Sequence, residues 1–273
     1  MTPLVHPALP ALSRPLTTLA AALLVASLCS PLHAQQLIAP TATVASFSQS
    51  ILSAQLAQWA LSYPTANNPL LDTTGAHSAL GDQGQNFFLA SSTSSTPVVR
   101  SVTVRTDQVL VFSPISIIYW TLPGDAINTE AGMLADAAFA FGDVSNLSVT
   151  FDGAPALLPS GVSSLDQFRQ SSPLFQLSFP VDHIYTGFGY PPGTFPAVTL
   201  GITYALEALP VGQHQLRFTS TNQSTGPYAA FPSFSYDVTY NITAVPEPAT
   251  VAMLCLGLAV VGGVAMRRRR ADH

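Results

Sequence analysis

Short runs in which apolar and polar residues alternate fill much of residues 98–245, and this period of two constrains the fold more than any other feature. In FSYDVTYNI, every second residue from Phe234 to Ile242 is apolar or aromatic. Because successive side chains of a strand point to opposite faces, this face belongs to a core. Similar runs are VVRSVTVR, QVLVF, SIIYW, LSVTF, LFQLSF, VTLGITYAL and QHQLRFTS. With their proline- and glycine-rich connections, they predict a mainly β fold, a single jelly-roll-like two-sheet sandwich, in which Pro114 separates QVLVF from SIIYW.

A helix is predicted before these strands. In SFSQSILSAQLAQWALSYP, Ser46 and Gln49 have the spacing of a capping box, and Pro64 ends the run. Apolar residues recur every three or four positions, so we expect this stripe to pack on the domain. The stripe consists of Phe47, Ile51, Leu52, Leu56, Trp59 and Ala60.

A second, short helix is expected to be inserted among the strands, over Thr129–Phe141. Asn128 or Thr129 is its expected N-cap, because short polar side chains accept hydrogen bonds from the first turn. Gly132 weakens this helix, because glycine loses more backbone entropy on folding than other residues.

The first 34 residues have the pattern of a secretory signal peptide. Arg14 precedes an apolar run from Leu16 to Leu28, and the expected signal peptidase site lies between Ala34 and Gln35. A lipoprotein signal acylated on Cys29 is the alternative, but the residue before that cysteine is bulky where such signals have a small one.

The last 28 residues combine three features in order. A proline-flanked acid is followed by an apolar run over 249–266 and by four arginines. At ~1.5 Å per residue, 18 helical residues reach about 27 Å, close to a ~30 Å hydrocarbon core. This run therefore predicts a transmembrane helix, with the arginines on the cytoplasmic side and the body outside.

This order closely resembles the PEP-CTERM sorting signal of Gram-negative bacteria that make exopolysaccharide. The resemblance implies processing by an exosortase, transient anchoring in the inner membrane, and release to the cell surface or extracellular matrix. The residues that carry it are Val245, Pro246, Glu247, Pro248, Arg267, Arg268, Arg269 and Arg270.

The domain between these ends, residues 35–245, contains neither cysteine nor lysine. Disulfides, cysteine-ligated zinc and a P-loop are therefore excluded there, and the fold depends on its core. Four arginines against twelve acidic residues leave this domain with a net charge of −8. Such a charge argues against a nucleic acid as partner.

A second resemblance covers roughly Gln58 to Thr243. The segments QWALSYPTANNPLLDTTGAHS, VLVFSPI, VTFDGAPA, LPVGQHQLRFTS and FSYDVTYNIT are similar, in order, to a group of exported bacterial proteins of unknown function. The resemblance implies one domain and no known activity. Where that group has two cysteines, this chain has Ser78 and Ser101.

Candidate ligand residues lie in two loops. Asp72, Asp82 and Asn86, with glycines between them, could supply oxygen ligands to calcium, although glycine-rich turns capped by aspartates are the preferred interpretation. Aromatic residues near TGFGYPPG could stack on sugar rings, although core packing is preferred. These aromatic residues are Tyr185, Phe188 and Tyr190.

No catalytic residue and no cofactor is assigned. His77, His183 and His214 lack metal-ligand spacing, and His183 is not expected to converge with Asp182 on a strand. The carboxylates that could form a glycoside hydrolase pair are Asp125, Glu130, Asp136, Asp143 and Asp152.

Three functions remain open. The first is a non-catalytic protein of the cell surface or exopolysaccharide matrix, with a role in adhesion or assembly. The second is a carbohydrate-binding module, and the third is an extracellular glycoside hydrolase. Exopolysaccharide is an expected partner in each of them.

Overall fold

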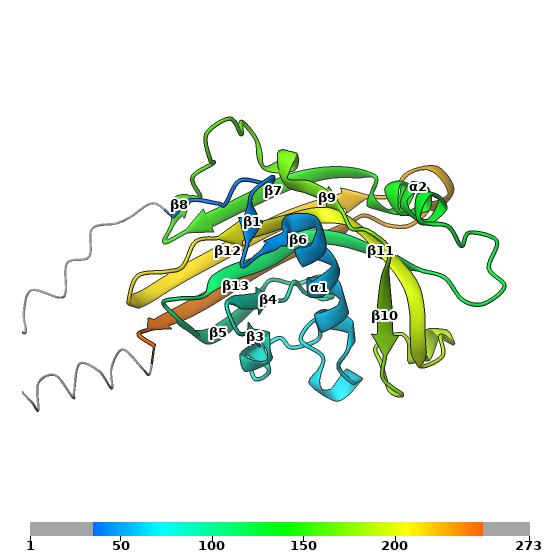
Figure 1. The fold of residues 1–273 in the computed structure, drawn as a ribbon, viewed down its shortest axis with the longest axis horizontal. Coiled ribbons are helices and arrows are strands. Elements are labelled where there is room, and N and C mark those ends of the chain that lie inside the picture. The colour runs from blue at the N-terminus through cyan, green and yellow to red at the C-terminus, as the bar shows by residue number, and fades with distance from the viewer. Residues whose placement is uncertain (1–34, 248–273) are drawn as a thin grey trace, which may run out of the picture. The chain divides into compact units, whose positions relative to one another are not determined.

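The computed structural model describes residues 35–247, which form two large β-sheets packed face to face and a small hairpin, β1-β2 (Figure 1). One sheet has six strands in the order β10-β11-β6-β4-β3, with β9 also paired to β11, and the other has five in the order β5-β13-β12-β7-β8. Helix α1 lies on the outer face of the six-stranded sheet. The predicted mainly β sandwich with two helices is confirmed.

The six-stranded sheet contains β3 (Asp82–Gln83), β4 (Asn86–Leu89), β6 (Val109–Trp120), β9 (Arg169–Ser171), β10 (Phe175–Phe179) and β11 (Gly193–Leu206). The five-stranded sheet contains β5 (Val98–Arg105), β7 (Asp143–Phe151), β8 (Ala154–Pro155), β12 (Gly212–Gln223) and β13 (Phe234–Val245). The remaining elements are β1 (Thr43–Val44), β2 (Phe47–Ser48), α1 (Gln49–Leu61), α2 (Glu130–Phe141) and the 3-10 helices η1 (Thr65–Asn67), η2 (Ser78–Gly81), η3 (Leu165–Phe168), η4 (Thr186–Phe188) and η5 (Gly226–Tyr228).

The last strand, β13, is central in its sheet. It pairs antiparallel with β12 on one side and parallel with β5 on the other, so that Val238 lies between Phe218 and Val98. A second parallel pair joins β4 to β6 in the other sheet. Strands β5 and β6 follow each other in sequence but belong to different sheets, so the turn between them links the two layers.

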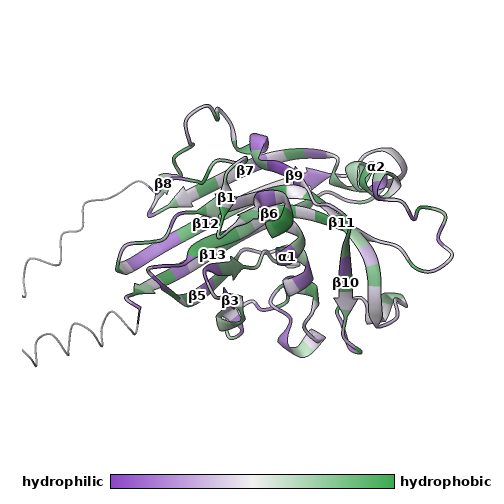
Figure 2. Ribbon diagram, viewed as in Figure 1, coloured by the Kyte–Doolittle hydropathy of each residue, from purple (hydrophilic) through white to green (hydrophobic). Residues whose placement is uncertain are grey.

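The core between the sheets comes from the inward face of each strand. Phe112 of β6 stacks on Phe218 of β12, with ring centroids 5.0 Å apart, and also contacts Tyr204 of β11 at 5.5 Å. Tyr240 of β13 continues this cluster beside Phe218. Hydrophobic and hydrophilic residues are interspersed along the strands (Figure 2), as the period of two predicts.

Strand β6 runs through Pro114, so the predicted break at this proline is wrong. The register between β6 and β11 shifts there, because Ile115 faces Ile202 whereas Phe112 faces Tyr204. A bulge of this kind leaves a residue outside the hydrogen-bond ladder, and proline, which has no N–H, is tolerated at such a position.

Helix α1 begins at Gln49 with Ser48 as its N-cap, so the predicted capping box from Ser46 to Gln49 is wrong. Ser48 Oγ accepts the N–H of Ile51, while the buried Gln49 amide donates to the carbonyls of Ile38 and Ala39.

The predicted apolar stripe of α1 is only partly buried. Leu52, Leu56, Trp59 and Ala60 pack on the six-stranded sheet, but Phe47 and Ile51 are each 39% exposed. The helix is apolar around most of its circumference, so the spacing alone did not determine which side faces the sheet.

Helix α2 matches its prediction closely. Thr129 is the N-cap, and its side chain accepts the N–H of Gly132. Ala137 and Phe141 enter the core, and the Arg169 guanidinium lies 4.2 Å from the centroid of the Phe141 ring.

Candidate functional site

The C-terminal sorting segment follows directly after β13. Val245 is the last residue of this strand, and its carbonyl accepts the N–H of Thr106 at 3.0 Å. Pro246 and Glu247 are half-buried. Pro248, the predicted span 249–266 and Arg267–Arg270 lie outside the described residues. Within residues 35–247, no helix has both the length and the apolar character needed to cross a membrane.

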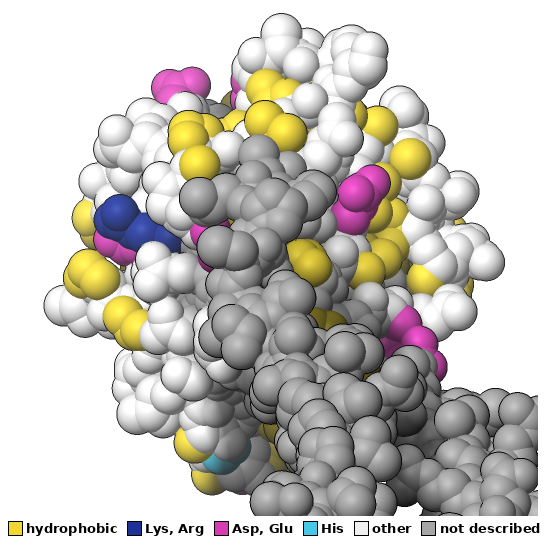
Figure 3. Space-filling view, turned by 90° about the vertical axis from the view of Figure 1, so that its left-hand side faces the viewer, with side chains coloured by type: hydrophobic (Ala, Val, Ile, Leu, Met, Phe, Trp, Pro, Cys, Tyr) yellow, Lys and Arg dark blue, Asp and Glu magenta, His cyan; other side chains and the backbone are white. Residues whose placement is uncertain are grey.

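The two ends of the described body lie at the same loop, the connection between β11 and β12. Gln35 is 8% exposed, and its side-chain amide donates to the carbonyl of Glu207 at 2.9 Å. Ala244, next to the end of β13, pairs with Gly212 at the start of β12. On this side of the body, charged side chains occur as scattered small groups among polar and hydrophobic atoms (Figure 3). Ala34, the residue before the predicted signal cleavage, lies outside the described part of the chain.

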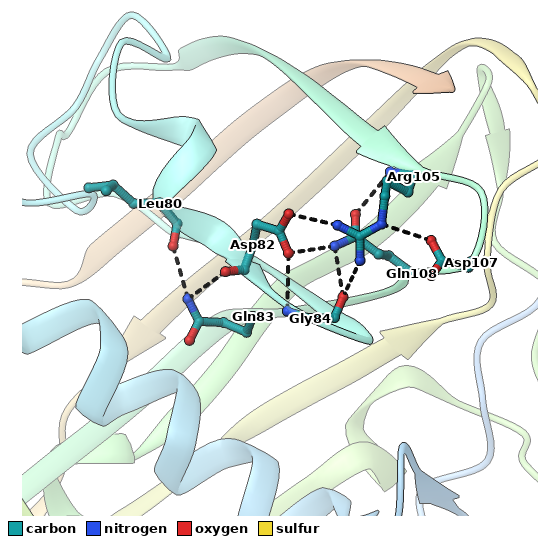
Figure 4. A network of polar contacts seen from close by, with 7 residues as sticks. All are labelled: Leu80, Asp82, Gln83, Gly84, Arg105, Asp107 and Gln108. Atoms are coloured by element: carbon teal, nitrogen blue, oxygen red, sulfur yellow. Dashed lines mark hydrogen bonds and ion pairs between the residues drawn. The ribbon is translucent and has the colours of Figure 1, made fainter. Parts of the chain in front are cut away.

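A polar network connects the β3–β4 hairpin to the turn between β5 and β6 (Figure 4). The Arg105 guanidinium contacts the carboxylates of Asp82 at 2.8 Å and Asp107 at 3.1 Å, and it donates to the carbonyl of Gly84 at 2.7 Å. Gln108 donates to the same Asp82 carboxylate at 2.8 Å. Asp82, a candidate calcium ligand, therefore already has an arginine and an amide as partners.

Asp72, the second candidate calcium ligand, caps its own loop. Its carboxylate accepts the backbone N–H groups of Thr74, Gly75 and His77 at 2.8–2.9 Å. Burial of the carboxyl acts to raise its pKa, but these hydrogen bonds prevail and lower the pKa to about 2. This is the aspartate-capped turn of the preferred interpretation. Within residues 35–247, no group of three or more His, Cys, Asp or Glu side chains is arranged to hold a metal ion.

Arg100 of β5 is buried, with 1% of its surface exposed, and it binds the backbone of two loops, one at Asp72 and the other at Ala90 and Ser91. Its guanidinium donates to the carbonyls of Asp72 at 2.7 Å, Ala90 at 2.6 Å and Ser91 at 2.9 Å, and to the hydroxyl of Tyr240 at 2.6 Å. None of the ion pairs among the described residues involves Arg100. Carbonyl and hydroxyl dipoles therefore take the place of a carboxylate.

Ser78 and Ser101, the two serines singled out in the sequence, lie together. The Ser78 hydroxyl donates to the carbonyl of Ser101 at 2.8 Å. Gly75 packs against the same backbone, since a Cβ built on it would lie 2.9 Å from the Ser101 nitrogen.

A groove of about 690 Å³ runs beside α1, and we call it the α1 groove. Its polar lining is mainly amide: Gln55, Gln58, Gln83, Asn86 and Gln176. Its aromatic lining is Phe47, Trp59, Tyr63, Phe88 and Phe175. None of the described residues that line it is Asp, Glu, His, Lys or Arg, so the groove is uncharged.

Asn86, the third candidate calcium ligand, lies in the wall of this groove. Asn86 and Phe88 alternate with Phe87 and Leu89 along β4, which directs Phe87 and Leu89 to the inter-sheet core and Phe88 to Trp59 of α1. The Asn86 residue is 5% exposed, and its Oδ1 atom has no hydrogen-bond partner within the described chain. A buried acceptor without a donor costs about 1–3 kcal/mol.

The aromatic loop residues cluster around Trp120 rather than forming a flat platform. The ring centroids of Tyr185 and Tyr190 both lie 5.0 Å from that of Trp120. The Tyr185 ring is inclined by 54° to Phe188 and by 78° to Tyr190, so the three rings do not share a plane. Burial, followed by the charge of Tyr190, raises the pKa of Tyr185. Phe188 is the most exposed of them, at 78%.

One histidine and one candidate carboxylate meet, which the sequence did not predict. His214 Nδ1 lies 2.9 Å from the Asp152 carboxylate, and His214 Nε2 lies 3.0 Å from the carbonyl of Pro210. Both ring nitrogens therefore face oxygen atoms of the protein itself. His183 is buried, with its ring stacked on Phe179 at 4.4 Å, whereas the neighbouring Asp182 is exposed.

The other candidate carboxylates have local roles or face solvent. Asp125 accepts the N–H of Leu122 at 2.7 Å, and Asp136 accepts the hydroxyl of Tyr228. This bond, followed by burial, raises the pKa of Tyr228 to about 12. Glu130 and Asp143 are exposed.

Sequence reasoning missed the α1 groove. Its walls come from α1, the β3–β4 hairpin and β10, which are far apart along the chain. One local signal was present: Gln55 and Gln58 are three positions apart on the helix, so they lie on the same side of it.

Comparison with known proteins identifies one segment of the chain, at its C-terminal end. A model of the PEP-CTERM protein-sorting motif matches residues 244–270. No curated protein and no solved structure matches the chain. The predicted sorting signal is confirmed: the chain carries a PEP-CTERM protein-sorting motif, which implies an exported protein that an exosortase processes.

Proposed function

We propose that the chain is a non-catalytic protein of the cell surface or exopolysaccharide matrix of a Gram-negative bacterium, where its body has a role in adhesion or assembly. Signal peptidase removes residues 1–34, and the exosortase cuts near Pro246-Glu247-Pro248. The observation that carries the proposal is the sorting motif directly after β13. Because β13 ends at Val245, a cut at this place leaves the pairing of the sheet complete.

The outer surface of the five-stranded sheet supports a role in contact with hydrated polymer. Apart from Val99, which is 53% exposed, the residues in the middle of this surface are polar, and we call them the polar sheet face: Ser101, Thr103, Ser148, Gln213, Gln215, Thr219, Thr221, Ser235, Thr239, Asn241 and Thr243, with Arg217 and Asp237. Hydrogen bonds connect neighbouring strands across it, as between Gln215 and Asn241 at 3.1 Å.

The polar sheet face carries almost no net charge. Its two charged residues, Arg217 and Asp237, neutralise each other in an ion pair of 2.8 Å. A sheet surface of hydroxyl and amide groups exchanges hydrogen bonds with water and with sugar hydroxyls, and it has few sites for non-specific charge attraction.

The test combines processing with location. Glu247→Ala should leave a full-length form in the membrane fraction, seen by immunoblot, and reduce the amount of body recovered with the exopolysaccharide. Glu207→Ala changes an exposed glutamate of the body and serves as the control, so it should be processed like the wild type. Unchanged size and location for Glu247→Ala would contradict the proposal, as would recovery of the mature body only from the periplasm.

A further inference from the structure

We infer that the α1 groove is a binding site for a segment of uncharged polysaccharide. This inference rests on the proposed function in one respect, because it names the class of polymer that the exported body contacts. It concerns a different surface from the polar sheet face and from the aromatic loop around Trp120.

The size and the lining of the groove fit such a ligand. A volume of about 690 Å³ lies within the range of about 300–1,000 Å³ of small-ligand sites. Aromatic rings pack on the C–H faces of sugars, and Tyr63 and Phe175 are half-buried, so each keeps part of its surface open. Amides both donate and accept, which matches a hydroxyl that does the same.

Two of the amides are held in place by the backbone. The N–H of Ser178 donates to Gln58 Oε1 at 2.9 Å, and Gln58 Nε2 lies 3.4 Å from the Ser178 carbonyl. Gln83 Nε2 donates to the carbonyls of Leu80 at 3.0 Å and Asp82 at 3.1 Å, while its side-chain oxygen points away from these bonds (Figure 4). Groups already fixed in one orientation lose less entropy when a ligand binds.

Asn86 supplies the observation that points to a ligand. Asn86 is one of the residues that line the groove, and its buried Oδ1 has no hydrogen-bond donor within the described chain. A hydroxyl of a bound sugar can donate to this oxygen. The carboxylates of an anionic polymer would find no basic partner in the groove, since none of its described lining residues is Lys, Arg or His, so we expect a neutral polymer to bind better.

The experiment uses the full-length chain, purified in mild detergent, in native gels that contain dextran, galactomannan or alginate. At least one of the two neutral polymers should retard the protein, and the acidic alginate should not. Asn86→Leu and Gln55→Ala should each raise the apparent Kd at least fivefold. Gln213→Ala, an amide removed from the polar sheet face, should leave the Kd unchanged. Gln55 is half-buried on the helix surface, so Gln55→Ala keeps the test valid if Asn86→Leu does not fold.

Four results would overturn the inference: no retardation by either neutral polymer, stronger retardation by alginate, retardation that neither groove variant weakens, or release by an uncharged Gly-Ser peptide, which would indicate a peptide ligand. Loss of polymer binding while the body still reaches the matrix would refute this inference alone. Membrane retention of the wild type with polymer binding intact would refute the proposed function alone.

Discussion

Arg100 gives the sharpest test of how the body is stabilised. Replacing it with methionine keeps most of the apolar stem and removes the guanidinium. The carbonyls of Asp72 and Ser91 then lose the donor that the structure shows, whereas the carbonyl of Ala90 keeps the hydroxyl of Tyr240 at 2.8 Å.

The expected loss follows from these two carbonyls. Each buried acceptor left without a donor costs about 1–3 kcal/mol. The contact between the guanidinium and the Tyr240 ring, 5.4 Å from its centroid, adds about 1 kcal/mol. The variant no longer has the desolvation penalty of a buried charge, and this makes the loss of stability smaller. We therefore expect Arg100→Met to lower the free energy of unfolding by about 3–5 kcal/mol, a large part of the ~5–15 kcal/mol typical of a domain.

Urea unfolding of the body, residues 35–247, followed by the fluorescence of Trp59 and Trp120, measures this loss. Arg217→Met is the matched control. Arg217 has a carboxylate partner in Asp237, but its side chain is 52% exposed, so we expect a loss of about 0–1 kcal/mol. Arg100→Lys should fall between the two, because one ammonium cannot reach all four acceptors.

A loss below about 1 kcal/mol for Arg100→Met, or a larger loss for Arg217→Met, would refute the reasoning. The first result would mean that the two carbonyls find other donors, and the second that the exposed ion pair of Arg217 contributes more than the buried hydrogen bonds of Arg100.

Two further predictions concern the same region. Because hydrogen bonds lower the pKa of Asp72 from 3.8 to about 2, its charged form stabilises the fold above pH ~4, and this contribution is lost as the pH falls to about 2. The stability difference between wild type and Asp72→Asn, from urea unfolding at several pH values, should therefore shrink across that window; a constant difference would argue against it. In the double variant Ser78→Cys and Ser101→Cys, oxidation should form a disulfide that closes a loop of about 24 residues and adds up to about 3 kcal/mol. Free thiols after oxidation, by mass spectrometry, would show that the contact is too wide or wrongly oriented.

Local patterns predicted what depends on local sequence. The strand Val98–Arg105 was predicted with the bounds that the structure has, and α2 had a recognisable cap in Thr129. The strand break predicted at Pro114 was wrong because a bulge opposite β11 accommodates this proline. That bulge depends on the pairing of β6 with β11, so the sequence around the proline does not predict it. The capping box predicted from Ser46 to Gln49 was wrong because the Gln49 side chain donates instead to the carbonyls of Ile38 and Ala39, which precede the helix.

The candidate sites likewise differ in how far the sequence alone could predict them. The sorting motif is one continuous segment whose three parts are read in order, so the sequence alone identified it. The α1 groove and the Arg100 anchor depend on segments brought together by the fold. Asn86 was named for calcium because of its neighbours in sequence, yet its neighbours in space are Phe88, Trp59 and a glutamine-rich helix face.

The central place of β13 has a consequence for the timing of export. Synthesis and translocation proceed from the N-terminus, so β5 and β12 are outside before their shared partner has arrived, and both present unpaired edges until then. The strand that closes the sheet is also the one that immediately precedes the sorting motif. Completion of the fold and presentation of the processing site therefore fall at nearly the same moment, and a chain cut short before Phe234 would lack both.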